Sequence, residues 1–460
     1  MHPPLHMVNS RIIMLAVLGG LIIALVAGGA GQRTASDAGS MERGRTVAYV
    51  ALTAGAGLLY AVAVFLVQGP ALARRAVWIV LAAAVAMRLL TVSAPPLLST
   101  DLYRYVWDGR VQAAGINPYI SLPADPALAG VRDSGTGVEA IYPNINRADT
   151  APTIYPPMAQ AIFAAVGLAW PTIWGMKAVM LAFDAVAIGA GLMLLHTARL
   201  PPERVLIYAW NPLPVWEFAG GGHIDAAALA LSGLALLAAI GRRPAWAGVA
   251  LALAILCKLL PAALFPALWR RWDLRMPLAC AAVIAAGYLY YADAGWRVLG
   301  YLPGYAIEEG LGNGSGFFLL RLLALLGPLP GWAGTAYLSV ALFGLLALAG
   351  WIALRTVLPA NPAQRAVVFC RDALWLGTAV VAVLSPHYPW YFAVVVLPAV
   401  LVPAPSALWL TLSAPVLYLD HGLDEIAWPA VVFLPFAVLL AREMMQRQAH
   451  PHPALIANGG

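Results

Sequence analysis

Long apolar runs recur along most of the chain, and they favour a helical membrane protein over any soluble architecture. A helix needs about 20 apolar residues to cross the roughly 30 Å hydrocarbon core of a bilayer. Full or partial runs of this kind occupy 12–30, 46–67, 76–97, 172–195, 205–219, 224–240, 245–258, 260–270, 276–293, 335–354, 366–385, 389–403, 405–419 and 427–442. The composition agrees, because 62% of the residues are hydrophobic and 10% are charged, whereas soluble domains have about 25% charged residues. We therefore predict an all-α, polytopic transmembrane bundle of roughly 11–14 spans.

Several runs are too short to cross a bilayer unaided. Prolines interrupt them at Asn211-Pro212, Pro214 and Pro261, and membranes tolerate such breaks where the freed backbone is buried in protein or lines a cavity. We expect kinked or broken helices there. The first run follows Arg11 and suits either a retained helix or a signal peptide. We favour the retained helix because it keeps the charge pattern consistent.

Basic residues mark one face of the predicted bundle. The pairs Arg74-Arg75, Arg242-Arg243 and Arg270-Arg271 fall on one side if every run crosses once, and the positive-inside rule makes that side cytoplasmic. Segment 157–170 must then be a juxtamembrane helix at the outer surface. Most remaining acids also fall outside: Asp101, Asp108, Asp225, Glu308, Glu309, Asp420 and Asp424.

This topology divides the chain into six segments, with both termini in the cytoplasm. We expect N-terminal helices (1–98), an extracytoplasmic loop (99–171), central helices (172–293), a second outer loop (294–334), C-terminal helices (335–447) and a cytoplasmic tail (448–460). The net charge of +6 is scattered in short clusters, which does not suggest nucleic acid as a partner. The spacing of Cys257, Cys280 and Cys370 matches neither a zinc site nor a disulfide framework, so we interpret them as packing residues.

The outer loop from about Ser99 to Thr172 is the longest non-spanning stretch, and a loop of that length in a compact bundle is usually functional. It opens with N-cap residues and has no helix breaker before Gly109, which predicts a short helix. Asp101, Arg104, Tyr105 and Asp108 stand at i, i+3, i+4 and i+7 and share one face of that helix.

Such a face would point two carboxylates and a guanidinium together. Glycosyl transfer needs a carboxylate to take a proton from the acceptor hydroxyl and cations to hold a phosphate leaving group. The alternative is a solvated amphipathic helix whose Tyr and Trp side chains anchor at the membrane interface. The residues of the helix alone leave both interpretations open.

The segment Asp101–Tyr119, DLYRYVWDGRVQAAGINPY, resembles the first outward loop of the GT-C integral membrane glycosyltransferases. Within that superfamily it is most similar to bacterial polyprenol-phosphate-mannose-dependent mannosyltransferases. Further matching motifs follow in order: Tyr155-Pro156-Pro157, Trp210-Asn211-Pro212, Gly222-His223-Ile224-Asp225, Lys258-Leu259-Leu260-Pro261 and Ser385-Pro386-His387-Tyr388-Pro389-Trp390-Tyr391. In the family this loop commonly follows the first span, whereas three predicted spans precede it here.

The resemblance implies a GT-C fold, a polyprenyl-phosphate sugar donor, and inverting transfer outside the bacterial cytoplasmic (inner) membrane. It also implies that an acidic residue of the first loop is the base. Asp101 matches that acid, and Asp108 is the second catalytic candidate. The candidate substrate-binding residues are Tyr103, Arg104, Tyr105, Arg110, Asn117, Tyr155, Glu217, His223, Asp225, Lys258, His387, Tyr388, Trp390 and Tyr391.

Several of these residues have a second interpretation. His223 and Asp225 would bind a sugar hydroxyl or phosphate, or would belong to a flexible turn that caps a helix. Lys258, one of two lysines, would meet a lipid phosphate or snorkel to the headgroups. An aromatic belt explains Trp390 and Tyr391 as well as sugar stacking does.

Two further polar features have simpler expectations. Asp184 looks too deep for the site and is expected to hydrogen-bond between helices. The loop from Asp293 to Arg321 is a candidate mobile cover over the site.

In the resulting hypothesis, some of Arg104, Arg110, Lys258 and His387 hold the lipid phosphate while Asp101 deprotonates a lipid- or glycan-linked acceptor. Asp108 would orient Arg104 or ligate a divalent cation. No cofactor is certain, and Mg²⁺ or Mn²⁺ stays open because two acids, phosphate and water would suffice as ligands. The alternative function is a lipid or sugar transporter or flippase, which broken helices also fit. No internal repeat supports that alternative.

Overall fold

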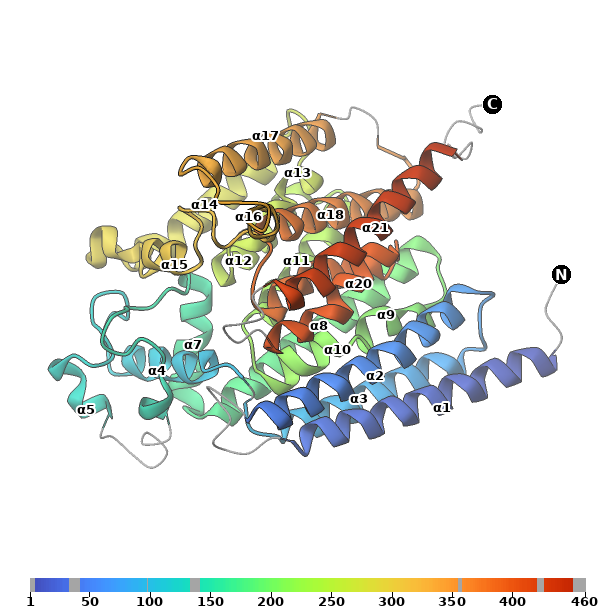
Figure 1. The fold of residues 1–460 in the computed structure, drawn as a ribbon, viewed down its shortest axis with the longest axis horizontal. Helices are drawn as coiled ribbons and strands as arrows, with labels where there is room; N and C mark the ends of the chain where they lie inside the picture. The colour runs from blue at the N-terminus through green and yellow to red at the C-terminus, as the bar shows by residue number, and fades with distance from the viewer. Residues whose placement is uncertain are drawn as a thin grey trace.

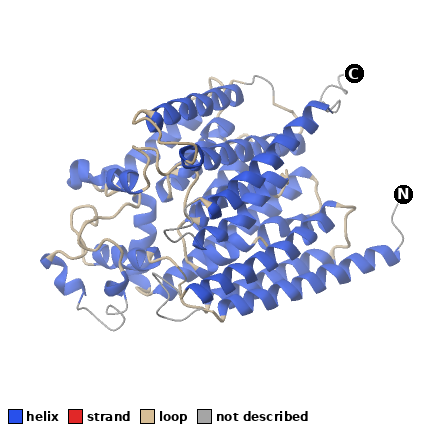
Figure 2. Cartoon of the chain, in the orientation of Figure 1, coloured by secondary structure: helices blue, strands red, loops and turns tan. Residues whose placement is uncertain are grey.

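The computed structural model describes residues 5–32, 42–96, 98–132, 141–354, 358–419 and 426–449. Every regular element in those ranges is a helix, and they contain no strand (Figure 2). This confirms the predicted all-α class. Asp420, Asp424 and the predicted tail from 450 onward lie outside the described residues.

Seven helices of the described residues are long and apolar enough to cross a membrane. They are α1 (Leu5–Ala30), α2 (Arg43–Gln68), α3 (Arg75–Val92), α8 (Ile173–Ala198), α17 (Ala333–Ala353), α18 (Pro362–Leu384) and α21 (Ala427–Ala449). An eighth span results if α14 (Arg275–Tyr290) is joined to the helices over 292–308, although the two parts bend by 111°. The chain is therefore an integral membrane protein built as a polytopic helical bundle.

Shorter apolar helices complete the bundle. They are α7 (Pro157–Ala169), α11 (Asp225–Ile240), α12 (Pro244–Cys257), the pair η7 (Pro389–Val395) and α19 (Val396–Ala399), and the pair α20 (Pro405–Ser413) and η8 (Ala414–Leu419). At 13 residues, α7 is not among the candidate spans.

The predicted helix breaks are confirmed at the prolines. Near Asn211-Pro212 the chain forms α9 (Leu206–Ala209), α10 (Pro212–Pro214) and the π-helical η4 (Val215–Gly220) in place of one helix. Near Pro261 it forms η5 (Leu260–Leu264) and α13 (Phe265–Leu268). Proline cannot donate the backbone hydrogen bond that a continuous helix needs.

The remaining elements lie in loops or turns. They are α4 (Asp101–Ala113), η1 (Pro126–Leu128), α5 (Ala129–Arg132), η2 (Tyr142–Asn144), η3 (Pro202–Val205), η6 (Ala292–Leu299), α15 (Leu302–Glu308) and α16 (Phe318–Ala324). Figure 1 places α4, α5, α7 and α15 at one end of the bundle, with the first turn of α1 and the last turn of α21 toward the opposite end.

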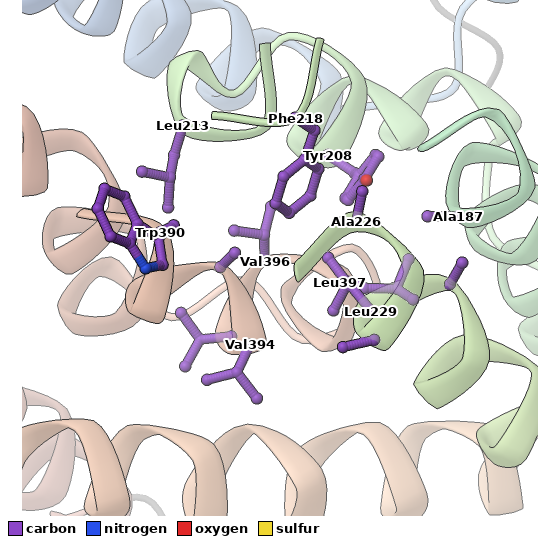
Figure 3. Close-up of a cluster of buried hydrophobic side chains, with 14 of the residues drawn as sticks. Ala187, Tyr208, Leu213, Phe218, Ala226, Leu229, Trp390, Val394, Val396 and Leu397 are labelled. Atoms are coloured by element: carbon purple, nitrogen blue, oxygen red, sulfur yellow. The ribbon is translucent and has the colours of Figure 1, made fainter. Parts of the chain in front are cut away.

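The bundle core joins segments that are far apart in sequence. Figure 3 shows Trp390, Val394, Val396 and Leu397 packing with Leu213, Phe218, Ala226 and Leu229. A buried polar cluster lies beside it, where Asp184 accepts hydrogen bonds from Arg88 of α3 and from Tyr208 of α9. The prediction that Asp184 hydrogen-bonds between helices is confirmed.

Candidate active site

Helix α4 begins at Asp101, as the sequence predicts, and the Ser99 hydroxyl accepts a hydrogen bond from the Asp101 backbone N–H. It continues through Gly109 to Ala113, which is longer than predicted. Gly109 is helical, and α7 crosses α4 closely at this position: a Cβ at Gly109 would lie 2.2 Å from the Phe163 carbonyl oxygen. Glycine therefore permits this close crossing and does not end the helix.

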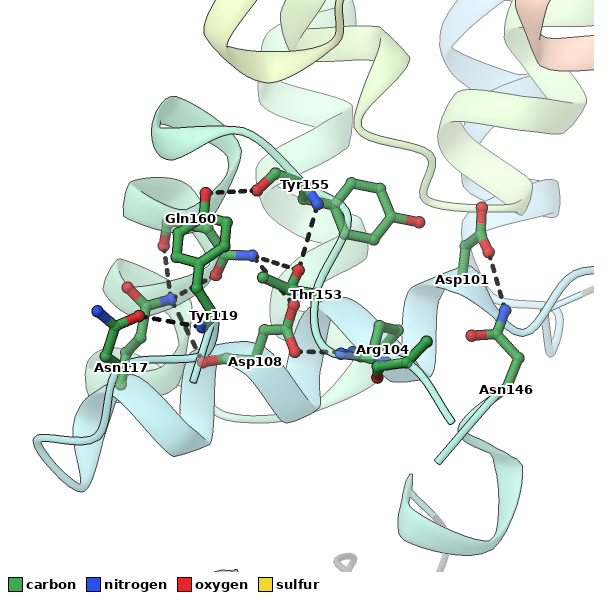
Figure 4. Close-up of polar contacts among 11 residues, drawn as sticks. Asp101, Arg104, Asp108, Asn117, Tyr119, Asn146, Thr153, Tyr155 and Gln160 are labelled. Carbon is green, nitrogen blue, oxygen red and sulfur yellow. Dashed lines mark hydrogen bonds and ion pairs between the residues drawn. The ribbon is translucent and has the colours of Figure 1, made fainter. Parts of the chain in front are cut away.

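The two carboxylates of α4 do not meet, and the prediction that they point together is wrong (Figure 4). Asp108 pairs with Arg104 at 2.8 Å and accepts a hydrogen bond from Gln160 at 3.0 Å. Asp101 lies apart and accepts a hydrogen bond from Asn146. Positions seven apart on a helix share a face but are separated by about 10 Å along the axis, so they reach different neighbours.

Asp108 belongs to a buried network that holds α4 on the segment leading into α7. Gln160 donates to Asp108 and also lies 2.7 Å from the Thr153 hydroxyl, and Gln112 donates to Gln160. Arg104 also donates to the Ala151 carbonyl. Asp108 is 1% exposed and Arg104 is 4% exposed, so their ion pair is buried within the loop.

Asp101 lies over the turn that precedes α11. Its Oδ2 is 4.0 Å from Nδ1 of His223, whose Nε2 is 3.3 Å from a Glu217 carboxylate oxygen. The Tyr418 hydroxyl donates to Glu217. His223 and Glu217 are buried, whereas the Asp101 side chain is 19% exposed. Asp101 is therefore the accessible end of an acid–histidine–acid row.

A stack of aromatic rings forms the neighbouring wall. The Trp390 ring lies 4.0 Å from His223 and 4.8 Å from Tyr388, both nearly parallel to it. Burial raises the pKa of the Tyr388 phenol to about 12, and the carboxylates Glu309 and Asp101 add to the effect. Tyr388 thus stays protonated at neutral pH beside two acids.

A pocket beside this wall combines one ion pair with apolar side chains. Nζ of Lys258 lies 3.2 Å from the Asp225 carboxylate and 4.7 Å from the centre of the Tyr391 ring. The pocket and the open space at its mouth together contain about 290 Å³ not filled by atoms, and Leu229, Pro261 and Val394 also line the pocket. It offers a cation next to a hydrocarbon surface.

The family model described as alpha-(1→6)-mannopyranosyltransferase, N-terminal domain (the MptA_B family), matches residues 7–272, more than half of the chain. The chain belongs to this family. It is a mannosyltransferase of the GT-C type. No curated protein and no solved structure matches the chain.

The mannosyltransferase match includes α4, the His223 turn and Lys258, whereas His387 to Tyr391 lie beyond it. The structure nonetheless brings both parts together, because Trp390 contacts His223 and Tyr391 contacts Lys258. His387 lies 3.2 Å from Glu309.

Arg110 and Asn117, two other predicted site residues of the mannosyltransferase, have their hydrogen-bond partners outside this cluster. Arg110 donates hydrogen bonds from Nε and one Nη to the Pro171 carbonyl, and Asn117 donates to Asp293. Tyr105 packs between Tyr155 and Phe163 in the contact of α4 with α7. Tyr103 is buried on α4.

In the part of the chain that the structure describes, no group of three or more His, Cys, Asp or Glu side chains is arranged to hold a metal ion. Asp101 and Asp108, the two acids considered for Mg²⁺ or Mn²⁺, have separate partners. Asp108 pairs with Arg104, as in the first of the two roles predicted for it.

Sequence reasoning missed several neutral partners of these side chains: Asn146, Thr153, Gln160, Tyr418, and Tyr305, whose hydroxyl lies 2.9 Å from the Tyr391 hydroxyl. They come from distant segments, and no motif marks them. Glu309 was noted only as part of the candidate cover, although its place beside His387 puts it at the site.

Proposed function

We propose that this mannosyltransferase moves mannose from a polyprenyl-phosphate carrier to a lipid- or glycan-linked acceptor, with inversion, on the extracytoplasmic side of the bacterial inner membrane. The proposal rests mainly on the Asp101 carboxylate. This carboxylate is accessible and lies at the edge of the group of side chains that includes His223, Lys258 and the apolar pocket beside Lys258. The family match supports mannose as the sugar. The family resemblance supports the carrier and the side of the membrane.

The pocket suits a lipid phosphate. Lys258 has three N–H donors, so its contact with Asp225 leaves others for phosphate oxygens. Leu229, Pro261 and Val394 would accompany the first part of a prenyl chain. His387 would contact the phosphate of the donor, and the aromatic ring of Tyr388 would contact its sugar.

Asp101 is the proposed general base. It takes the proton of the acceptor hydroxyl while that oxygen bonds to the anomeric carbon. The bond from the anomeric carbon to the phosphate oxygen breaks, and polyprenyl phosphate leaves with the electron pair. His223 and Glu217 are buried behind Asp101 and would hold its position.

Transfer is tested with purified full-length protein, radiolabelled polyprenyl-phosphate mannose and a mannoside-bearing acceptor. Asp101→Asn should lower the rate about 10²- to 10⁴-fold, the range expected for a lost general base. Asp149→Asn, an exposed carboxylate of the same loop, is the matched control. Folded Asp101→Asn with normal transfer would exclude Asp101 as the base.

The same preparation tests the alternative and the orientation. Movement of labelled lipid across vesicles without any sugar transfer would favour a flippase. In intact cells, an impermeant thiol reagent should label Asp101→Cys and spare Arg243→Cys. The opposite pattern would contradict the proposed side of the membrane.

A further inference from the structure

Helix α15 brings two side chains onto the segment that carries His387. Tyr305 and Glu309 are four residues apart in the sequence, and so are the two residues that they contact, Tyr391 and His387. The Tyr305 hydroxyl lies 2.9 Å from the Tyr391 hydroxyl, and a Glu309 oxygen lies 3.2 Å from Nδ1 of His387. Two contacts of the same spacing fix one segment against the other.

We propose that Glu309 and Tyr305 are positioning residues for the phosphate-binding side chains of the donor site. This rests on the proposed polyprenyl-phosphate donor. The predicted cover loop thereby becomes a part of the binding site.

Glu309 acts on the imidazole of His387. A carboxylate at Nδ1 keeps a proton on that nitrogen and fixes the ring. Nε2 then faces the ligand, and it donates to a phosphate oxygen when the imidazole carries both protons. The Glu309 and His387 side chains are 15% and 29% exposed. The pair is thus sheltered at its carboxylate while the ring stays accessible to a phosphate.

Tyr305 acts on Lys258 through Tyr391. The Lys258 ammonium lies 4.7 Å from the Tyr391 ring centre, within the range of a cation–π contact. The Tyr305 hydroxyl holds the Tyr391 hydroxyl, so it restrains the ring that faces Lys258. One short helix therefore sets both proposed phosphate contacts.

The neighbouring Glu308 provides a matched control because it faces other partners. Arg147 of the first loop binds it at 2.6 Å, and the Tyr301 hydroxyl donates to it. Its side chain is 36% exposed. Substitution of Glu308 therefore tests the anchoring of α15, and substitution of the adjacent Glu309 tests the positioning of His387.

The experiment measures the affinity of purified protein for polyprenyl phosphate, the product lipid, together with kcat and KM for transfer. Glu309→Ala should weaken polyprenyl phosphate binding about tenfold, the size expected for losing one hydrogen bond between charged groups. KM should rise similarly, with kcat within about threefold of wild type. Tyr305→Phe should weaken binding about threefold, as for a neutral hydrogen bond.

Control variants separate positioning from general damage. Glu308→Ala should change binding less than about twofold, as exposed ion pairs contribute little. Glu309→Gln keeps an acceptor for Nδ1 and should fall between wild type and Glu309→Ala. Glu309→Ala combined with His387→Ala should bind no more weakly than His387→Ala alone, because the two contributions are coupled.

Equal effects of Glu308→Ala and Glu309→Ala, or additive losses in the double variant, would overturn the inference. If Glu309→Ala does not fold, wild-type affinity in Glu309→Gln would overturn it. Wild type that binds polyprenyl phosphate in a Glu309-dependent way but transfers no mannose would support the inference and refute the proposed function. Wild type that does not bind polyprenyl phosphate would overturn both.

Discussion

Asp101 and Asp108 lie on the same helix, two turns apart, and their surroundings give them different capacities. Asp108 is 1% exposed and is held by Arg104 and Gln160. Asp101 is partly exposed and accepts one long hydrogen bond, 3.3 Å, from Asn146. A carboxylate that is fully paired stabilises structure, whereas one that is accessible and loosely held can take a proton. The environment therefore separates two acids that the helical pattern alone does not.

The largest effect is expected for Asp108→Asn, which tests whether Asp108 stabilises the structure. It leaves the Arg104 cation buried without its anion, so the free energy of unfolding should fall by about 3–5 kcal/mol. Thermal unfolding of the purified protein measures the loss. Asp149→Asn should be neutral. A stable but inactive Asp108→Asn would instead show that Asp108 takes part in the reaction.

Gln160→Leu removes a neutral hydrogen-bond partner of Asp108 and tests how much that partner contributes to stability. Asp108 would keep Arg104 but lose the amide hydrogen bond, and Gln112 and Thr153 would lose a partner. The expected loss is about 1–3 kcal/mol of unfolding free energy. Combining it with Asp108→Asn should cost less than the sum, since both changes act on one network. Additive losses would argue against a shared network.

The fold was predictable because its signal is distributed over the whole chain. Apolar runs and prolines gave the class and the broken helices near Asn211 and Pro261, and an acid in an apolar run indicated the helix-to-helix contact of Asp184. The N-terminus of α4 was also predictable, since Ser99 and Thr100 favour a helix start.

The site was only partly predictable because contacts between distant segments decide it. Helical spacing showed that Asp101 and Asp108 share a face, but it could not show that Gln160 meets one and His223 the other. Arg110 lies on the opposite face of the same helix, and the Pro171 carbonyl accepts hydrogen bonds from its Nε and one Nη. Spacing gives direction within a helix, and packing chooses the partner.

A smaller effect is expected at Asn146, the side chain that holds Asp101. Asn146→Ala removes one long hydrogen bond at a partly exposed position, so stability should change by less than about 0.5 kcal/mol. Transfer should fall about two- to fivefold because Asp101 loses its orientation. Initial rates at saturating donor measure it. A loss as large as that of Asp101→Asn would mean that Asn146 itself contacts the substrate.

The smallest expected effect concerns Glu308, which is exposed like Asp101 yet held by several partners like Asp108. Burial alone would raise its pKa, but hydrogen bonds from Arg147 and Tyr301 outweigh this and lower the pKa below its usual range. A carboxylate with a lowered folded pKa stabilises the folded state above its ordinary value of about 4.3, and this contribution is lost as pH falls through the folded pKa. Because the pair is exposed, we expect only about 0.5 kcal/mol.

The protection of α15 amides, measured as exchange rates corrected for the intrinsic pH dependence of amide exchange, should therefore decrease by a small amount in wild type when the pH is below about 4. Glu308→Gln should show the faster exchange already at pH 7 and lose this part of the pH dependence. Glu309→Gln is the control, because it leaves the contact with Arg147 intact. Unchanged exchange in Glu308→Gln would mean that the contacts of Tyr305 and Glu309 hold α15 by themselves. Glu308 would then resemble Asp101, because an exposed carboxylate would contribute little to stability even with several partners.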